Sequence, residues 1–377
     1  MYPHLAVVRD LVDRGHRVTY LVGGHLADLP RPTGADVVGF DSLLPGSPHA
    51  GHWPDDDAAG MRMFLDDSIH VLPQVRAALD AERPDIVLYD IGGFAGPVAA
   101  DGWGILSVQL SPSIVAWDTY RQDMKDVLDP LFESEGGKAY LTAFNDWLAP
   151  TSLTFEEVTG EPRRCLVLIP RAMQPNADRV DRGRYRFVGP CIDPRREDPG
   201  DWTPPAGEGP LVLLAFGTAY TDRIDLYHNM IKALDGTGWR LVMATGNVRP
   251  DALGAVPQWV QLRDKVPQPA VLRIADAFVT HAGMGSCTEA LWYGVPTVAI
   301  PQAVDQPGNA AQLEAIGAGR HLTANPPAPA EIRDALLGVA SDPQIRLRLD
   351  AIREELHRVG GPGRAADAVE EVATGRW

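Results

Sequence analysis

Basic residues are scarce in this sequence of 377 residues. Lys and Arg number 34 against 50 Asp and Glu, which gives a formal net charge of −16 and a pI near 5.0. A protein that binds nucleic acid or an anionic membrane surface needs a basic face. The charge balance therefore argues against both partners, and we expect a soluble enzyme.

Cysteines and long apolar runs are also scarce. Cys165, Cys191 and Cys287 are the three cysteines, and no C-x-x-C pair occurs among them, so the sequence predicts no disulfide framework and fits a reducing cytoplasm. No apolar run approaches about 18 residues, and the first residues do not follow the pattern of a signal peptide, so we expect no membrane span. No D-x-D motif or histidine cluster stands in a site-like context, so we expect no metal site.

The length of the chain predicts two domains. A sequence of 377 residues is too long for one ordinary core, and its hydrophobic content of 45% suffices for two. Six prolines fall between Pro190 and Pro210, which is typical of a linker. We therefore predict a first domain over residues 1–189, a linker over 190–209, and a second domain with terminal helices over 210–377.

Apolar runs alternate with helical patterns in both halves. The strands predicted for the first half are Arg17–Val22, Asp36–Phe40, Asp85–Asp90, Ile105–Leu110, Cys165–Ile169 and Tyr185–Val188. Those predicted for the second half are Leu211–Ala215, Leu241–Ala244, Trp259–Leu262, Ala277–Val279 and Thr297–Ile300. Alternation of strand and helix predicts an α/β fold with two doubly wound parallel sheets. Asp90 then ends a parallel strand, where ligands of such sheets bind.

A glycine-containing turn after the strand Ala277–Val279 is the strongest candidate site. His281, Gly283 and Gly285 lead into a helix predicted to open at Ser286. The free N–H groups and dipole of a helix N-terminus favour a phosphate, and glycine allows its close approach. Ser286 and Glu289 also fit a capping box, S-x-x-E, so a purely structural role for this pair stays open. Cys287 fits buried packing better than reactivity.

The stretch from Asp276 to Asn309 resembles the donor-binding signature of family 1 glycosyltransferases, which transfer sugars from nucleotide diphosphates. The matching segments are His-Ala-Gly-Met-Gly-Ser and Pro-Gln-Ala-Val-Asp-Gln. The resemblance implies that Gln268 packs on the base, Glu289 binds the ribose diol, and Asp305 with Gln306 holds the sugar. The full set of donor-binding residues that it implies is Thr218, Val266, Gln268, His281, Gly283, Gly285, Ser286, Cys287, Glu289, Asp305 and Gln306.

The same resemblance implies a fold and a reaction. The family has two Rossmann-like domains facing across a cleft, the GT-B fold, and inverts the anomeric carbon without a metal or another cofactor. Within it, the motifs look most like bacterial macrolide glycosyltransferases that use UDP-glucose. The acceptor would be a hydrophobic natural product, bound by the first domain, and a homodimer is a further expectation. Asp90 matches the carboxylate that orients the catalytic histidine of the family.

Two departures from the family pattern keep other functions open. Lys265 replaces an aromatic residue, often Trp, that precedes the Pro-Gln pair, which leaves base stacking and the choice between uridine and thymidine donors open. The chain enters at Met1-Tyr2-Pro3, so the first strand and the catalytic histidine of the family would fall before Met1. We expect a missing histidine to impair transfer, and His4 to be a poor substitute. A nucleotide-sugar binder or helper protein, an epimerase and a lipid-linked transferase remain as alternatives.

Overall fold

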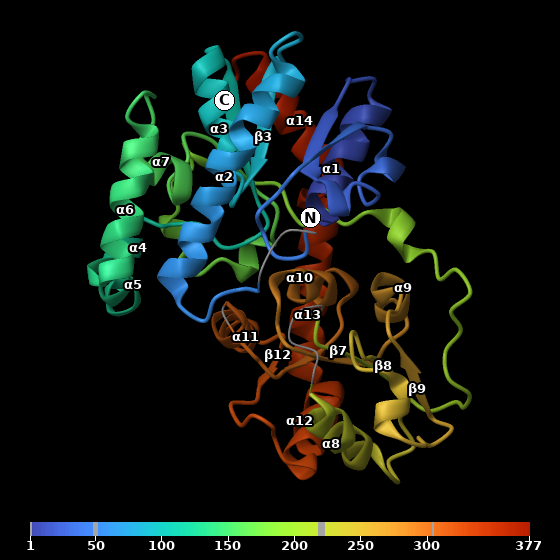
Figure 1. Ribbon diagram of the computed structural model, residues 1–377. Helices are drawn as coiled ribbons and strands as arrows, with labels where there is room; N and C mark the ends of the chain where they lie inside the picture. The colour runs from blue at the N-terminus through green and yellow to red at the C-terminus, as the bar shows by residue number, and fades with distance from the viewer. Residues whose placement is uncertain (1, 48–51, 218–222, 304) are drawn as a thin grey trace. The chain divides into compact units, whose positions relative to one another are not determined.

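The chain folds into two units, each of which contains strands and helices (Figure 1). The first comprises residues 1–169, 176–191 and 361–377, and the second residues 170–175 and 192–360. The computed structural model describes residues 2–47, 52–217, 223–303 and 305–377. In that part of the chain, no helix is both long and apolar enough to cross a membrane.

The second unit is built on a parallel sheet of six strands. Their order is β12-β11-β10-β7-β8-β9, which is doubly wound with the reversal of direction between β7 and β10. The strands are β7 (Leu211–Ala215), β8 (Arg240–Ala244), β9 (Val260–Arg263), β10 (Ala277–Thr280), β11 (Thr297–Ala299) and β12 (Gly319–His321). The helices are α8 (Ile224–Leu234), α9 (Gln268–Leu272), α10 (Met284–Tyr293), α11 (Gln306–Ala315), α12 (Pro329–Ser341) and α13 (Pro343–Val359).

Both faces of this sheet are covered, because its strands are apolar on both sides. Val212 and Leu214 of β7 face a cluster completed by α8 and α12, which lie side by side. Leu211 and Leu213 face the opposite cluster, which includes residues of α9 and α10. A run of five consecutive buried residues in β7 is what a central parallel strand needs. The predicted doubly wound second domain is confirmed.

The first unit contains two parallel sheets in the described residues. One pairs β1 (Thr19–Gly23) with β2 (Asp36–Phe40). The other has the order β3-β4-β5-β6, with β3 (Ile86–Asp90), β4 (Leu106–Ser111), β5 (Cys165–Val167) and β6 (Tyr185–Phe187). The helices are α1 (Tyr2–Asp13), α2 (Asp57–Leu79), α3 (Ala95–Trp103), α4 (Tyr120–Asp123), α5 (Lys125–Glu133), α6 (Glu135–Leu148), α7 (Phe155–Thr159) and α14 (Pro362–Ala373). The predicted parallel pairing is confirmed, although no ladder joins β1 or β2 to β3 among the described residues.

The last helix corrects the predicted domain boundary. We predicted residues 210–377 as one domain, but residues 361–377 belong to the first unit. The reason is that α14 packs on α1, where Ala365, Ala366 and Val369 meet Val7 and Leu11 in one apolar cluster. Likewise, residues 192–209 of the predicted linker group with the second unit.

Candidate functional site

The turn between β10 and α10 forms an open helix N-terminus. The helix begins at Met284, two residues earlier than predicted, because Gly283 adopts the extended cap conformation. Cys287 N–H donates the first bond of the helix, to Gly283 O, and the cap residue Gly283 makes no side-chain cap bond. The N–H groups of Met284, Gly285 and Ser286 therefore precede the first intrahelical bond, as an anion site requires.

The imidazole of His281 lies at the switch point of the sheet, between two glycines. A Cβ atom on Gly217 would lie 2.8 Å from His281 Nε2, and one on Gly283 would lie 2.5 Å from it. These glycines therefore make room for the ring. Burial lowers the pKa of His281, while the backbone of Ala215 and the charge of Asp305 oppose that shift. A neutral imidazole beside these amides can donate one hydrogen bond to an anion. Among the described residues outside its own helical turn, a Cβ placed on Gly285 would meet nothing within 4 Å, so these residues leave space above the first turn.

Glu289 is held in the middle of α10 and is buried. Gln268 Nε2 donates to Glu289 Oε2 at 2.7 Å and lies 3.5 Å from Ser286 Oγ. Arg196 Nη1 lies 2.6 Å from Glu289 Oε1. Three predicted residues, Gln268, Ser286 and Glu289, thus come together at one place. The capping-box alternative is wrong, because Gly283 and not Ser286 caps the helix.

Asp305 and Gln306 lie at the start of α11 and are tied to the glycine turn. Asn309 Nδ2 donates to Asp305 Oδ2 at 2.7 Å and to Ala282 O at 3.1 Å, so one side chain joins the two loops. Gln306 Oε1 accepts from the N–H groups of Gln302 and Ala303, at 2.8 and 3.1 Å. The carboxylate of Asp305 is exposed, whereas Gln306 is buried and shapes its own loop.

The other residues predicted to bind the sugar donor either pack in the interior or lie outside the described part of the chain. Val266 is half-buried against the apolar cluster beneath α9 and α10. Cys287 is fully buried, and burial raises the pKa of its thiol, which confirms the packing interpretation. Thr218 lies outside the described residues. Sequence reasoning missed Arg196 and Asn309. Arg196 stands 93 residues from Glu289, and no local pattern connects them.

Asp90 ends β3 in the first unit, as predicted. Its side chain is 45% exposed, and His4 Nδ1 of α1 lies 3.2 Å from its Oδ2. A carboxylate only accepts hydrogen bonds, so Nδ1 of His4 carries the proton in this pair. Burial lowers the pKa of His4 to about 4, and Nε2 is buried without a partner in the described structure.

Apolar side chains surround the turn that follows Asp90. Ile91 is 40% exposed, and a Cβ on Gly92 would lie 3.0 Å from Phe64. The ring of Phe64 in turn packs against Trp53 with centroids 5.6 Å apart. A carboxylate therefore stands beside a partly exposed aromatic and aliphatic surface, which suits a hydroxyl-bearing apolar molecule.

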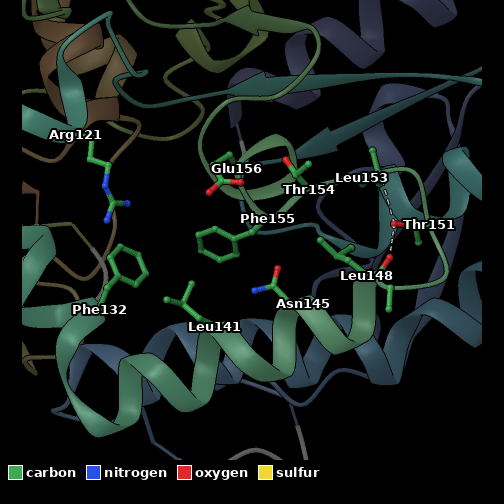
Figure 2. A pocket seen from close by; sticks show the side chains of 11 residues that line it. Arg121, Phe132, Leu141, Asn145, Leu148, Thr151, Leu153, Thr154, Phe155 and Glu156 are labelled. Atoms are coloured by element: carbon green, nitrogen blue, oxygen red, sulfur yellow. Dashed lines mark hydrogen bonds between the residues drawn. The ribbon is translucent and has the colours of Figure 1, made fainter.

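A separate cavity of about 730 Å³ lies in the first unit beside α6 and α7. Figure 2 shows Phe132, Leu141, Asn145 and Phe155 turned toward the same space. The complete lining is Arg121, Phe132, Leu141, Asn145, Leu148, Ala149, Thr151, Leu153, Thr154, Phe155 and Glu156. Both apolar and polar side chains line it.

Comparison with known proteins gives one family and close relatives. Residues 231–372 match the family described as erythromycin biosynthesis protein CIII-like, C-terminal domain. Oleandomycin glycosyltransferase of Streptomyces antibioticus is 41% identical over 379 residues, covering 98% of this chain and 87% of the relative. NDP-glycosyltransferase YjiC of Bacillus licheniformis is 31% identical, with 98% and 93% covered.

Solved structures with the same architecture cover nearly the whole chain. The glycotransferase of kitacinnamycin superposes with a TM-score of 0.90 at 39% identity, covering 98% of this chain and 95% of that one. CalG4, the calicheamicin glycosyltransferase, superposes with a TM-score of 0.85 at 29% identity, covering 100% and 95%. Both neighbours are GT-B proteins with two Rossmann-like domains, which agrees with the two units described above.

Proposed function

This chain belongs to the family 1 glycosyltransferases, and from that premise we propose that it transfers glucose from UDP-glucose to a hydroxyl group of a hydrophobic natural product such as a macrolide. The observation that carries the donor side is the open N-terminus of α10, with His281 beside it and Glu289 one turn further on. The acceptor class is supported by the relative named for oleandomycin and by the apolar surface next to Asp90.

The donor would be held by dipoles and hydrogen bonds and not by a general positive field, since the chain is acidic. We place the diphosphate on the N–H groups of Met284, Gly285 and Ser286, with His281 donating a further bond. The carboxylate of Glu289 would accept the ribose hydroxyls, and Asp305 would accept those of the sugar. The same amides would stabilise the charge that develops on the leaving diphosphate.

The acceptor would lie on Ile91, Phe64 and Trp53, with its hydroxyl near Asp90. In the proposed inverting displacement, the acceptor oxygen forms the bond to C1 of glucose while the bond from C1 to the diphosphate breaks. The acceptor hydroxyl gives its proton to the carboxylate of Asp90, which we assign as the catalytic base, and UDP leaves with the electron pair of the broken bond. His4 would position that carboxylate through its Nδ1–H.

We also propose that the reaction needs neither a metal ion nor another cofactor and that it occurs in the cytoplasm. The amides of α10 supply stabilisation that a cation would otherwise give. Three buried free thiols, Cys165, Cys191 and Cys287, fit a reducing compartment.

A donor and acceptor panel tests the proposal. The protein is incubated with UDP-glucose or TDP-glucose and with macrolides or flavonoids, with and without EDTA, and products are detected by mass spectrometry. We expect glucosylated macrolide from UDP-glucose in both the presence and absence of EDTA. Asp90→Asn should lower kcat by about 100-fold or more while UDP binding is unchanged. Donor consumption without a glycoside product, or full activity of Asp90→Asn, would contradict the assignment.

A further inference from the structure

A turn of the linker segment is fastened to one face of α10. The turn η5 (Pro194–Glu197) places Arg196 on Glu289, with Nη1 2.6 Å from Oε1. The next residue, Glu197, accepts a hydrogen bond of 2.9 Å from the hydroxyl of Tyr293. Glu289 and Tyr293 are four residues apart and therefore lie on the same face of the helix. Two successive linker residues thus bind two successive turns of α10.

This contact covers the carboxylate that we assign to the ribose. Arg196 occupies Oε1, Gln268 occupies Oε2, and the side chain of Glu289 is only 7% exposed. A ribose diol bound by a carboxylate offers two hydroxyl donors, which need acceptor positions on those oxygens. Arg196 and Gln268 leave about one acceptor position on each oxygen, but the side chain is almost completely covered, so the ribose can reach Oε1 only where the guanidinium moves aside.

We propose that Arg196 is a latch on the ribose site, which closes over Glu289 when no nucleotide is bound and must be displaced by the ribose hydroxyls. The proposal rests on the role of Glu289 in the proposed function. Arg196 is 25% exposed on the side chain and belongs to a short turn, so it can move toward solvent without unfolding α10. The apparent affinity for the nucleotide is the affinity of the open form multiplied by the fraction of molecules in which the latch is open. Arg196 is accordingly a positioning residue that sets donor affinity and takes no part in the chemistry.

Removal of the guanidinium should tighten nucleotide binding. We expect Arg196→Ala to lower the Kd of UDP by roughly threefold to tenfold, which corresponds to a latch closed in most of the unliganded molecules. Arg196→Gln keeps a neutral donor near Glu289 and should give a smaller gain in the same direction; it also guards against a folding defect in Arg196→Ala. Arg195→Ala is the matched control, because it removes the same charge from an exposed residue of the same turn. It should leave the Kd unchanged.

Three ligands identify where Arg196 acts, with Kd measured by calorimetry or by competition. Uridine, which has the diol but no phosphate, should gain affinity by the same factor as UDP. The 2′,3′-dideoxy analogue of UDP has no hydroxyl for Glu289 and should bind the wild type and Arg196→Ala equally. Weaker binding of UDP with unchanged binding of uridine would overturn the latch and place Arg196 on the diphosphate. Weaker binding of both would show that Arg196 only supports Glu289, which also overturns it.

Glu289→Ala separates the latch from the proposed function. If Glu289 binds the ribose, this variant should raise the Kd of UDP by roughly tenfold or more, since the charge-assisted hydrogen bonds to the ribose hydroxyls are lost. Weaker UDP binding by Glu289→Ala together with an unchanged Kd of UDP in Arg196→Ala would refute the latch and leave the ribose assignment in place. An unchanged Kd in Glu289→Ala would refute the ribose assignment itself.

Discussion

At the scale of single residues, Gln306 has one role that the structure shows and a second role that the family resemblance implies. Its carbonyl oxygen binds the N–H groups of Gln302 and Ala303, so it fixes the loop before α11. The resemblance assigns its amide to the sugar. A substitution to alanine removes both, and therefore cannot separate them.

The pair Gln306→Glu and Gln306→Ala separates the two tasks. Glutamate keeps an acceptor for the loop amides and loses the amide donor. If the amide binds the sugar, Gln306→Glu should lower kcat/KM for UDP-glucose by about tenfold, the value of one hydrogen bond, while the Kd of UDP stays the same. If Gln306→Glu transfers glucose like the wild type and Gln306→Ala does not, Gln306 acts only by holding the loop. Steady-state kinetics and calorimetry give the two quantities.

His4 should make the stability of the first unit depend on pH. Burial lowers the pKa of His4 to about 4 in the folded protein, whereas the unfolded chain has the ordinary value of 6.5. Between these values the unfolded state binds more protons, so the free energy of unfolding must fall as the pH drops from about 6.5 toward 4. At about 1.4 kcal/mol per pKa unit, the loss from pH 7 to pH 5 amounts to about 2 kcal/mol.

Urea titrations at pH 7 and pH 5 measure this difference. His4→Gln should flatten the dependence, although His281 contributes in the same direction because burial lowers its pKa too. His52→Gln removes an exposed histidine and should keep the wild-type slope. An equal slope in His4→Gln and the wild type would mean that His4 is not held neutral.

At the scale of elements, the sequence predicted the strands well where both faces are buried. Leu211–Ala215 is predicted to the residue, because five apolar residues in a row are diagnostic of a covered parallel strand. Gly319–His321 was not predicted, since a glycine and two basic residues have little strand character. Its glycine is required by packing, because a Cβ there would lie 2.2 Å from Thr297 O. That requirement exists only in the folded sheet.

The site was most predictable where its residues share a local motif. His281, Gly283, Ser286 and Glu289 follow one another in a strand, a turn and a helix, so their meeting is a consequence of local geometry. The contacts of Glu289 with Arg196 and of Asp90 with His4 join segments distant in sequence. Such pairs depend on how each unit folds, and no local sequence pattern connects the two partners.

The carboxyl ends of β3 and β4 should set acceptor affinity. Ile91 and Ile114 follow these strands and are 40% and 37% exposed. Ile91→Ser should raise the acceptor KM by roughly fivefold, because about 1 kcal/mol of apolar contact is lost, and leave the KM of UDP-glucose unchanged. Leu141→Ser is the matched control in the cavity of Figure 2. If the acceptor KM increases in Leu141→Ser and not in Ile91→Ser, the acceptor binds in that cavity.

At the scale of the whole molecule, the chain returns to its first unit at its end. The helix α13 ends at Val359 in the second unit, and α14 then lies beside α1 (Figure 1). Besides the apolar cluster, Arg14 lies 2.7 Å from Asp367 and 3.1 Å from Glu370. These ion pairs are exposed and contribute little, so the buried alanine and valine face holds the helix.

A charge on that face should therefore destabilise the first unit and spare the nucleotide site. Val369 is 5% exposed, and Val369→Asp would bury a carboxylate without a partner, which costs roughly 3 kcal/mol or more. Ala373→Asp adds the same group at an exposed position of α14 and should change stability little. Calorimetric scanning should show a lowered transition for Val369→Asp that UDP does not restore to the wild-type temperature, while the Kd of UDP at low temperature stays the same. If Val369→Asp binds UDP more weakly but keeps the wild-type unfolding temperature, residues 361–377 support the second unit and not the first.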